Sequence, residues 1–316
     1  ERHIVPYIIS YIMDSTLLPT SIDENGTTNT NSSTAGGDVS LGDYAKTNNT
    51  DQLTIDQVEQ IRTEIASEQP LIGPPQSVSN LLTKYQDTSS PGFIPGIHYL
   101  ANHFSSMRQV RGDGNCFYRA LLFGFLENLL KMHLSGNEQL INRAQNELQR
   151  ITTVIQGSLE ELINLGYPEF ALEGFHEEFL EILNELFQQS INSLLDMFQE
   201  SGKADYLTWY LRVLTAGYLK RDPDRFLPFI DGLYFDIASF CTAEVEPMNK
   251  ECEQIQIIAL TEYLGITIEI SYLDGRSFDE SVGVSKVIFP DPTNQPKEEN
   301  AVVNEALKVN LLYRPG

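Results

Sequence analysis

The chain of 316 residues has few cysteines, and they are widely spaced. Cys116, Cys241 and Cys252 form no Cys-x-x-Cys pair, so the sequence predicts neither a disulfide framework nor a zinc site. We expect no metal or other cofactor. Sparse thiols that stay reduced are typical of intracellular proteins, so we expect a cytoplasmic location, with the nucleus also open.

Basic residues are scarce as well. The chain has 21 Lys and Arg against 44 Asp and Glu, a formal net charge of −23. This balance argues against a nucleic-acid-binding protein, which needs clustered cations to neutralise phosphates, and against an anionic membrane surface. It suits a partner with a basic face, although a negative surface often serves solubility alone.

Long apolar runs are also absent. The apolar segment 4–12 is nine residues long and contains Pro6, which is too short for a membrane span, and it has no signal-peptide cleavage pattern. Because the chain begins with Glu1 and Met13 would make an ordinary start, we interpret 1–12 as translated leader sequence. Residues 20–50 are rich in Thr, Asn, Ser and Gly, so we expect a disordered N-terminal segment over residues 1–50.

The most informative motif places one cysteine, Cys116, at the start of a very apolar helix, directly after a turn in which Gly112 and Gly114 flank Asp113. The positive end of the helix dipole should lower the pKa of this thiol, and the backbone N–H groups of Gly114, Asn115 and Cys116 should stabilise an oxyanion. Asp113 and Asn115 are both candidate N-cap residues. The pattern indicates a thiol nucleophile for acyl transfer, against the commoner role of cysteine as a buried packing residue.

The remaining pattern has helices first and strands last. We expect a buried helix from 116 to about 132, and amphipathic helices from 137 to about 221 with a stripe formed by Phe175, Phe179, Ile182 and Leu186. Another helix over 254–263 should end at Gly265. Alternating residues predict strands at 266–272, 286–289 and 308–313. The segregation of helices and strands predicts an α+β fold.

Residues 113–120 (Asp-Gly-Asn-Cys-Phe-Tyr-Arg-Ala) resemble the nucleophile motif of the otubains, the C65-type branch of the ovarian-tumour (OTU) cysteine proteases. Further segments resemble otubain landmarks in the same order: 205–207, 210–212, 215–219, 244–248, 257–260 and 311–316. The resemblance implies an OTU-type papain-like fold over 51–316, with a small central sheet between helical layers. It also implies a monomeric deubiquitinase, a thiol protease acting on ubiquitin conjugates and polyubiquitin chains.

The resemblance also implies two further catalytic positions. Asp113 matches a residue commonly counted with the otubain catalytic set. We expect it to shape the loop through its backbone, to support the oxyanion site or to cap the helix. In otubains a catalytic His follows the Tyr-Arg-Pro-Gly segment, whereas this chain ends at Gly316, so we expect the domain to be C-terminally incomplete and its general base to be missing. The chain has five histidines, and we interpret His176, in a helical stretch, as non-catalytic.

Three alternatives to an active ubiquitin hydrolase stay open at this point. The first alternative is a non-catalytic regulator that binds ubiquitin and ubiquitin-conjugating enzymes. The second is an inactive fragment without its base, and the third is a hydrolase for another ubiquitin-like modifier. Gln254-Ile255-Gln256 stands where many otubains carry His-x-His, so no linkage preference is predicted.

Overall fold

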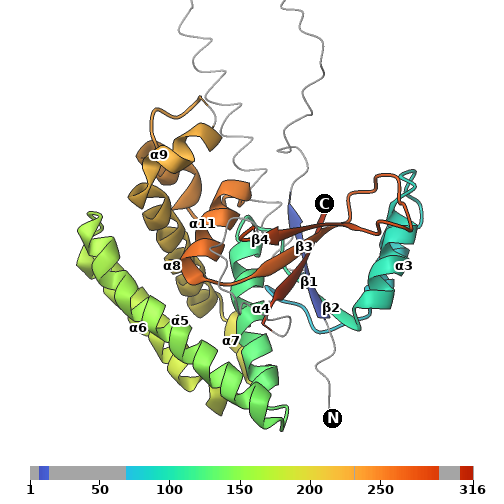
Figure 1. Cartoon of the computed structure of the whole chain (residues 1–316), viewed down its shortest axis with the longest axis horizontal. Coiled ribbons are helices and arrows are strands. Elements are labelled where there is room, and N and C mark those ends of the chain that lie inside the picture. The colour runs from blue at the N-terminus through green and yellow to red at the C-terminus, as the bar shows by residue number, and fades with distance from the viewer. Residues whose placement is uncertain (1–6, 14–68, 231, 292–306, 316) are drawn as a thin grey trace, which may run out of the picture. The chain divides into compact units, whose positions relative to one another are not determined.

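The computed structural model of the chain describes residues 7–13, 69–230, 232–291 and 307–315. Residues 7–13 and 70–315 among these belong to one compact unit, shown in Figure 1. The helix expected from residue 54 onward lies outside the described residues.

Five strands form one mixed sheet in the order β2-β1-β5-β3-β4. Their bounds are β1 Tyr7–Met13, β2 Ser106–Gln109, β3 Ile268–Tyr272, β4 Ser285–Phe289 and β5 Val309–Pro315. β1 pairs in parallel with β2 and β5, β3 pairs in parallel with β5, and β4 is antiparallel to β3. The three C-terminal strands predicted from the sequence are confirmed as β3, β4 and β5.

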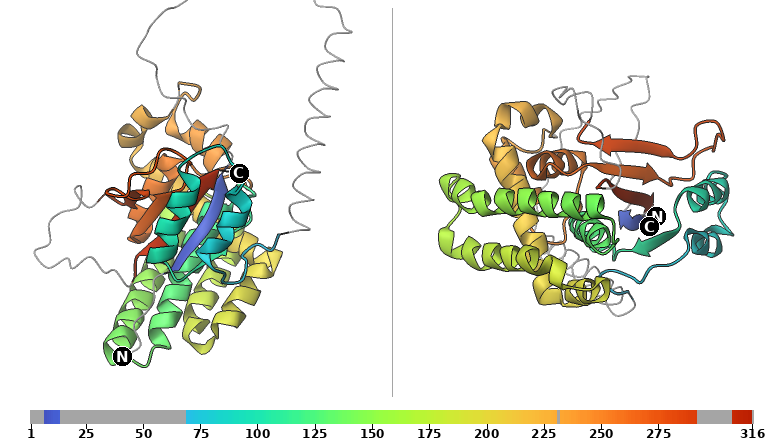
Figure 2. Two further views of the ribbon diagram at one scale, coloured as in Figure 1. Left: turned by 90° about the vertical axis from the view of Figure 1, so that its right-hand side faces the viewer. Right: turned by 60° about the horizontal axis from the view of Figure 1, so that its bottom comes forward.

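β1 corrects the expectation for the N-terminus. Ile9 pairs with Leu311 of β5 and is fully buried, so β1 is an inner strand of the sheet (Figure 2, blue). The prediction of disorder over residues 1–50 is therefore wrong for 7–13, and the rest of that range lies outside the described residues. The reason is physical: a run of aromatic and β-branched residues too short for a membrane is the ordinary length of a strand.

The two faces of the sheet are covered by different helices. Adjacent side chains of a strand point to opposite faces, so Leu311 of β5 joins the core around α4 (Cys116–His133), whereas Leu312 joins the core around α3 (Phe93–His103). A Cβ on Gly124 of α4 would lie 2.7 Å from Val309 and 2.8 Å from Ile9, so glycine lets this helix approach the strands closely. The helix that begins at Cys116 therefore packs directly on the sheet.

α4 is the central element of the domain, and every residue in it except Lys131 and His133 is buried. Its one buried acid, Glu127, is neutralised by two cations: Arg108 of β2, at 2.8 Å from Nη2 to Oε1, and Lys131, at 3.3 Å from Nζ to Oε2. Because α4 has no polar face that would expose Glu127 to water, ion pairs compensate the charge of this carboxylate.

The segment after α4 is helical, as predicted. It comprises α5 Glu138–Asn164, α6 Glu169–Glu185, η3 Leu186–Gln188, α7 Ile191–Gln199 and α8 Ser201–Arg221. Phe179, Ile182 and Leu186 of the predicted stripe are buried, and Phe175 packs against them. α5 and α6 lie side by side in both views of Figure 2.

Short elements complete the described chain. They are η2 Val78–Asn80, α2 Leu81–Tyr85, α9 Pro223–Phe226, η4 Leu227–Phe229, α10 Ile237–Phe240, the π-helical turn η5 Cys241–Val245 and α11 Gln254–Leu264. Gly265 ends α11 with a φ of 62°, the predicted left-handed position. Among the described residues, no helix combines the length and apolarity that a bilayer crossing requires.

Candidate active site

Cys116 is the first residue of α4, with Asn115 in the N-cap position. The preceding turn needs glycine, because Gly114 has a φ of +80° and a Cβ there would lie 2.4 Å from the carbonyl carbon of Asn249. The predicted placement of the thiol at a helix start behind a tight glycine turn is confirmed.

Asp113 fixes the turn through its carboxylate. Oδ1 accepts the backbone N–H of Asn115 at 3.0 Å, and the two carboxylate oxygens accept Nη1 and Nη2 of Arg119 at 3.1 and 3.0 Å. A two-pronged bond to a buried arginine on the cysteine helix is strong and directional. Asp113 also shapes the loop through its backbone, as expected, because its N–H donates to Arg111 O at 3.2 Å. The side-chain bonds add to this role, whereas the expectation that Asp113 caps the helix is wrong, since Asn115 is the N-cap residue.

Asn115 occupies the N-cap position but makes no side-chain capping bond. Its Oδ1 accepts Arg212 Nη2 at 2.9 Å, Arg212 Nε at 3.2 Å and the Asn249 backbone N–H at 2.9 Å, and its Nδ2 donates to Asn249 Oδ1 at 2.8 Å. The Asn115 side chain therefore joins the loop before Cys116 to two distant segments, at Arg212 and at Asn249. Capping by either predicted residue is wrong, because the Asp113 side chain binds Arg119 and the Asn115 N–H, and the Asn115 side chain binds Arg212 and Asn249.

The backbone N–H groups predicted to stabilise the oxyanion differ in where they are directed. The Asn115 N–H donates to Asp113, so it is removed from the predicted set of Gly114, Asn115 and Cys116. The Cys116 N–H shares a peptide with the Asn115 carbonyl, which accepts the first helical hydrogen bond, from Arg119 N at 3.1 Å. Because that carbonyl points into the helix, the Cys116 N–H points outward from the helix start. The Phe117 N–H hydrogen-bonds the Cys116 sulfur.

The thiol itself is buried, with 3 % of its surface exposed. Burial is the main cause that raises the pKa of Cys116 to about 12, and the carboxylates of Asp113 and Glu251 raise it further. Arg119 and the Phe117 N–H act in the opposite direction. The expected lowering of the pKa by the helix start is therefore wrong here, because desolvation of a thiolate outweighs the dipole.

No described histidine is among the groups that act on the pKa of Cys116. His176 is buried on α6, where its Nε2 lies 2.9 Å from the Ile155 carbonyl oxygen, which fits the interpretation of a non-catalytic residue. His133 stacks on Phe187, and His103 contacts the Tyr99 carbonyl oxygen.

Sequence reasoning missed Arg212 on α8 as a site residue. It is fully buried, and its guanidinium donates to Gly114 O at 2.7 Å and to Val245 O at 3.0 Å, besides Asn115 Oδ1 and Lys250 O. It also lies 4.5 Å over the ring of Tyr118. The available signal was an arginine within the apolar stretch of a helix, which must find several acceptors if it is buried.

A cavity of about 270 Å³ adjoins the nucleophile loop through Asn249. Its other lining residues are Phe175, Asp205, Tyr206, Trp209 and Met248. Burial raises the pKa of Asp205, Arg119 lowers it and Asp113 raises it, so this carboxylate belongs to the charged surroundings of the loop.

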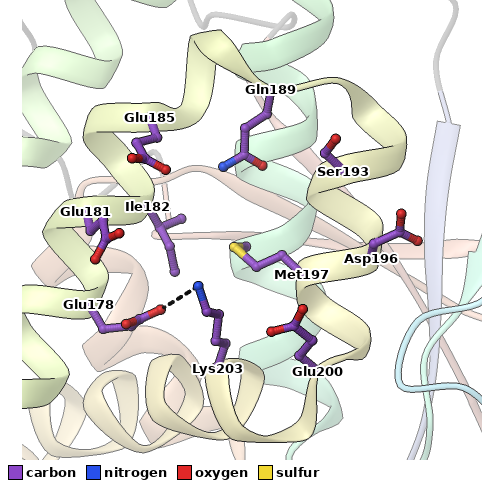
Figure 3. A pocket seen from close by; sticks show the side chains of 10 residues that line it. All are labelled: Glu178, Glu181, Ile182, Glu185, Gln189, Ser193, Asp196, Met197, Glu200 and Lys203. Carbon is purple, nitrogen blue, oxygen red and sulfur yellow. Dashed lines mark ion pairs between the residues drawn. The ribbon is translucent and has the colours of Figure 1, made fainter.

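A second cavity, of about 280 Å³, lies between α6, α7 and the start of α8 (Figure 3). Its lining is mostly acidic, with one ion pair between Lys203 Nζ and Glu178 Oε1 at 3.3 Å. Across the described ranges, no group of three or more His, Cys, Asp and Glu side chains is arranged to hold a metal ion.

A cysteine that begins the central helix of an α+β domain, with a polar loop locked around it, defines the class of cysteine hydrolases. Comparison with known proteins narrows this class. The chain belongs to the otubain family, because the family model Peptidase C65 Otubain matches residues 64–316.

Curated relatives agree with this membership. The chain is 36% identical over 267 residues to human "Ubiquitin thioesterase OTUB1", covering 84% of this chain and 88% of the relative. It is 33% identical over 271 residues to "OVARIAN TUMOR DOMAIN-containing deubiquitinating enzyme 1" of Arabidopsis thaliana, covering 83% and 84%.

The fold comparison agrees as well. The solved structure "The structure of h/ceOTUB1-ubiquitin aldehyde-UBC13~Ub" superimposes with a TM-score of 0.69 at 27% identity, covering 84% of this chain and 94% of that chain. The resemblance and the OTU-type α+β fold predicted from the sequence are confirmed.

Proposed function

We propose that this chain hydrolyses thioester and isopeptide bonds at the C-terminus of ubiquitin, with the sulfur of Cys116 as the nucleophile. The observation that carries the proposal is the position of Cys116 as the first residue of α4, behind a loop fixed by Asp113 and Arg212. Membership of a family whose relatives are named ubiquitin thioesterases supports it.

The chemistry follows from that geometry. Cys116 Sγ attacks the carbonyl carbon at the ubiquitin C-terminus, and the oxygen of the tetrahedral intermediate lies at the helix start, where the Cys116 N–H points outward. A thiol with a pKa of about 12 is protonated at neutral pH. Attack therefore needs a base that takes the Sγ proton and later protonates the departing amine or thiol. The resemblance to otubains implies that a His following the Tyr-Arg-Pro-Gly segment has this role, so the proposed turnover requires a protein that carries this His. Asp113 is not that base, since both its oxygens are held by Arg119.

We place the ubiquitin-docking surface on an apolar patch formed by Leu227, Phe229, Leu233 and Phe235. These side chains are 44%, 73%, 85% and 94% exposed, which is unusual for large apolar residues of one segment. Several large apolar side chains exposed within one short segment are a feature of protein-binding surfaces, and we propose that they contribute to ubiquitin docking.

The test is cleavage of ubiquitin bearing a fluorogenic C-terminal amide, together with labelling by ubiquitin that carries a C-terminal electrophile. Residues 1–316 alone should turn over poorly, and a chain extended by the residues expected after Gly316 should regain turnover. In the extended chain Cys116→Ala should lower turnover by about a thousandfold or more and abolish labelling. Cys241→Ala is the matched control, because that buried thiol lies in η5 and contacts the Ala216 carbonyl; it should keep both. Labelling of a cysteine other than Cys116 would refute the assignment.

A second function has its own support. The solved relatives contain UBC13~Ub or UBCH5B~Ub together with OTUB1, so binding of ubiquitin-conjugating enzymes extends naturally to this chain. Cys116→Ala separates the two functions, because unchanged suppression of ubiquitin conjugation by this variant identifies a non-catalytic regulator.

We also propose a cytoplasmic location, which the three free thiols support. Immunofluorescence of the natural protein tests it.

A further inference from the structure

Arg212 is bound in a manner that an ordinary structural ion pair does not explain. Its guanidinium is fully buried, and each partner that the described hydrogen bonds give it is a neutral oxygen: three backbone carbonyls and one side-chain amide. These oxygens come from two segments, the nucleophile loop (Gly114 and Asn115) and the stretch from Val245 to Lys250 that follows η5.

Only the planar guanidinium group of an arginine can donate hydrogen bonds to all of these acceptors at once. Nη2 alone reaches Gly114 O, Asn115 Oδ1 and Lys250 O, while Nη1 reaches Val245 O and Nε reaches Asn115 Oδ1 again. A lysine ammonium would carry the same charge with three donors on a flexible stem and could not reproduce this geometry.

The bond to Gly114 O fixes one particular peptide. Its carbonyl oxygen is held by Arg212 at 2.7 Å, and its N–H, that of Asn115, is held by Asp113 at 3.0 Å. The peptide between Gly114 and Asn115 is thereby clamped at both ends. The next peptide carries the Cys116 N–H and leads directly into the helix, so its direction follows from this clamp.

We propose that Arg212 is a positioning residue for the hydrolysis, which fixes the peptide between Gly114 and Asn115 so that the Cys116 N–H and Cys116 Sγ face the same carbonyl group. This inference rests on the proposed function. Arg212 acts through geometry, because its hydrogen bonds go to the Gly114 carbonyl and the Asn115 amide on one side and to the 245–250 stretch on the other.

The experiment uses the full chain and ubiquitin with a C-terminal electrophile, and it separates the saturating labelling rate of Cys116 from the concentration of half-saturation. Arg212→Lys should lower the saturating rate by about a hundredfold, the loss expected of a misplacement near 1 Å. The half-saturating concentration should stay within about threefold, since Arg212 is fully buried and cannot contact ubiquitin directly.

Arg108→Lys is the matched control. Arg108 is also buried, also lies near an aromatic ring, and also donates to a backbone carbonyl, but its main partner is Glu127 and it does not touch the nucleophile loop. It should label at the wild-type rate although it too is destabilised.

Asn115→Ala provides a second variant should Arg212→Lys not fold. It removes the amide acceptor of Arg212 and leaves the bond to the Gly114 carbonyl, so about a tenfold loss in saturating rate is expected. Wild-type rates in Arg212→Lys or in Asn115→Ala, or equal losses in Arg108→Lys and Arg212→Lys, would overturn the positioning role. A wild-type chain whose Cys116 is not labelled would instead refute the proposed function, and the inference with it.

Discussion

Arg108 and Arg212 are both buried and both lie over an aromatic ring, yet their partners are opposite in kind. Arg108 pairs with the carboxylate of Glu127, so β2 is tied to α4 by charge neutralisation. Arg212 binds neutral carbonyl and amide oxygens, so its bonds fix the direction of each acceptor and neutralise no carboxylate. The comparison teaches that the first arginine serves the stability of the fold and the second the geometry of the loop.

The largest expected effect breaks the Arg108 side of this comparison. Glu127→Ala leaves Arg108 and Lys131 without their carboxylate, and removing one partner of a buried ion pair costs about 3–5 kcal/mol. Urea unfolding should reveal this loss in the free energy of unfolding, whereas the labelling rate of the fraction that remains folded should be unchanged. A loss below about 1 kcal/mol would mean that the cluster is solvated.

A smaller effect is expected on the Arg212 side. Gly114→Ala places a Cβ 2.4 Å from the Asn249 carbonyl carbon and forces alanine to a φ of +80°. We expect a loss of about 2 kcal/mol in the free energy of unfolding, together with a slower reaction of Cys116. Gly136→Ala is the control, since that glycine also has a positive φ, of +73°, but no neighbour within 4 Å of a Cβ; it should cost less and leave the reaction unchanged.

The smallest effect concerns the thiol and separates charge from geometry. The Asp113 carboxylate raises the pKa of Cys116 and Arg119 lowers it. Asp113→Asn removes the negative charge that raises the pKa of Cys116 and leaves the Arg119 charge that lowers it. The pKa of Cys116 should therefore fall. The pH at which iodoacetamide alkylation of Cys116 reaches half its maximal rate should therefore move downward, while Arg212→Lys should leave it in place. An upward shift in Asp113→Asn would contradict this account of the charges.

Much of the domain could be predicted from local patterns. The alternation in β3, the all-apolar helix that starts at Cys116 and the left-handed glycine at 265 are each encoded within a few neighbouring residues. β1 was not predictable in this way, because Tyr7–Met13 acquires its meaning only by pairing with residues 106–109 and 311–315.

The features of the site also divide into those encoded by neighbouring residues and those set by long-range contacts. Local patterns were enough to predict that one cysteine begins a buried helix behind a glycine turn, since dihedral preference and apolar periodicity depend on neighbouring residues. The environment of that cysteine was not predictable in this way, because its burial and the acceptors of Arg212 depend on residues far apart in the chain. Desolvation and hydrogen-bond direction depend on those distant neighbours, and for this reason the pKa of Cys116 rose where the local motif alone predicted a fall.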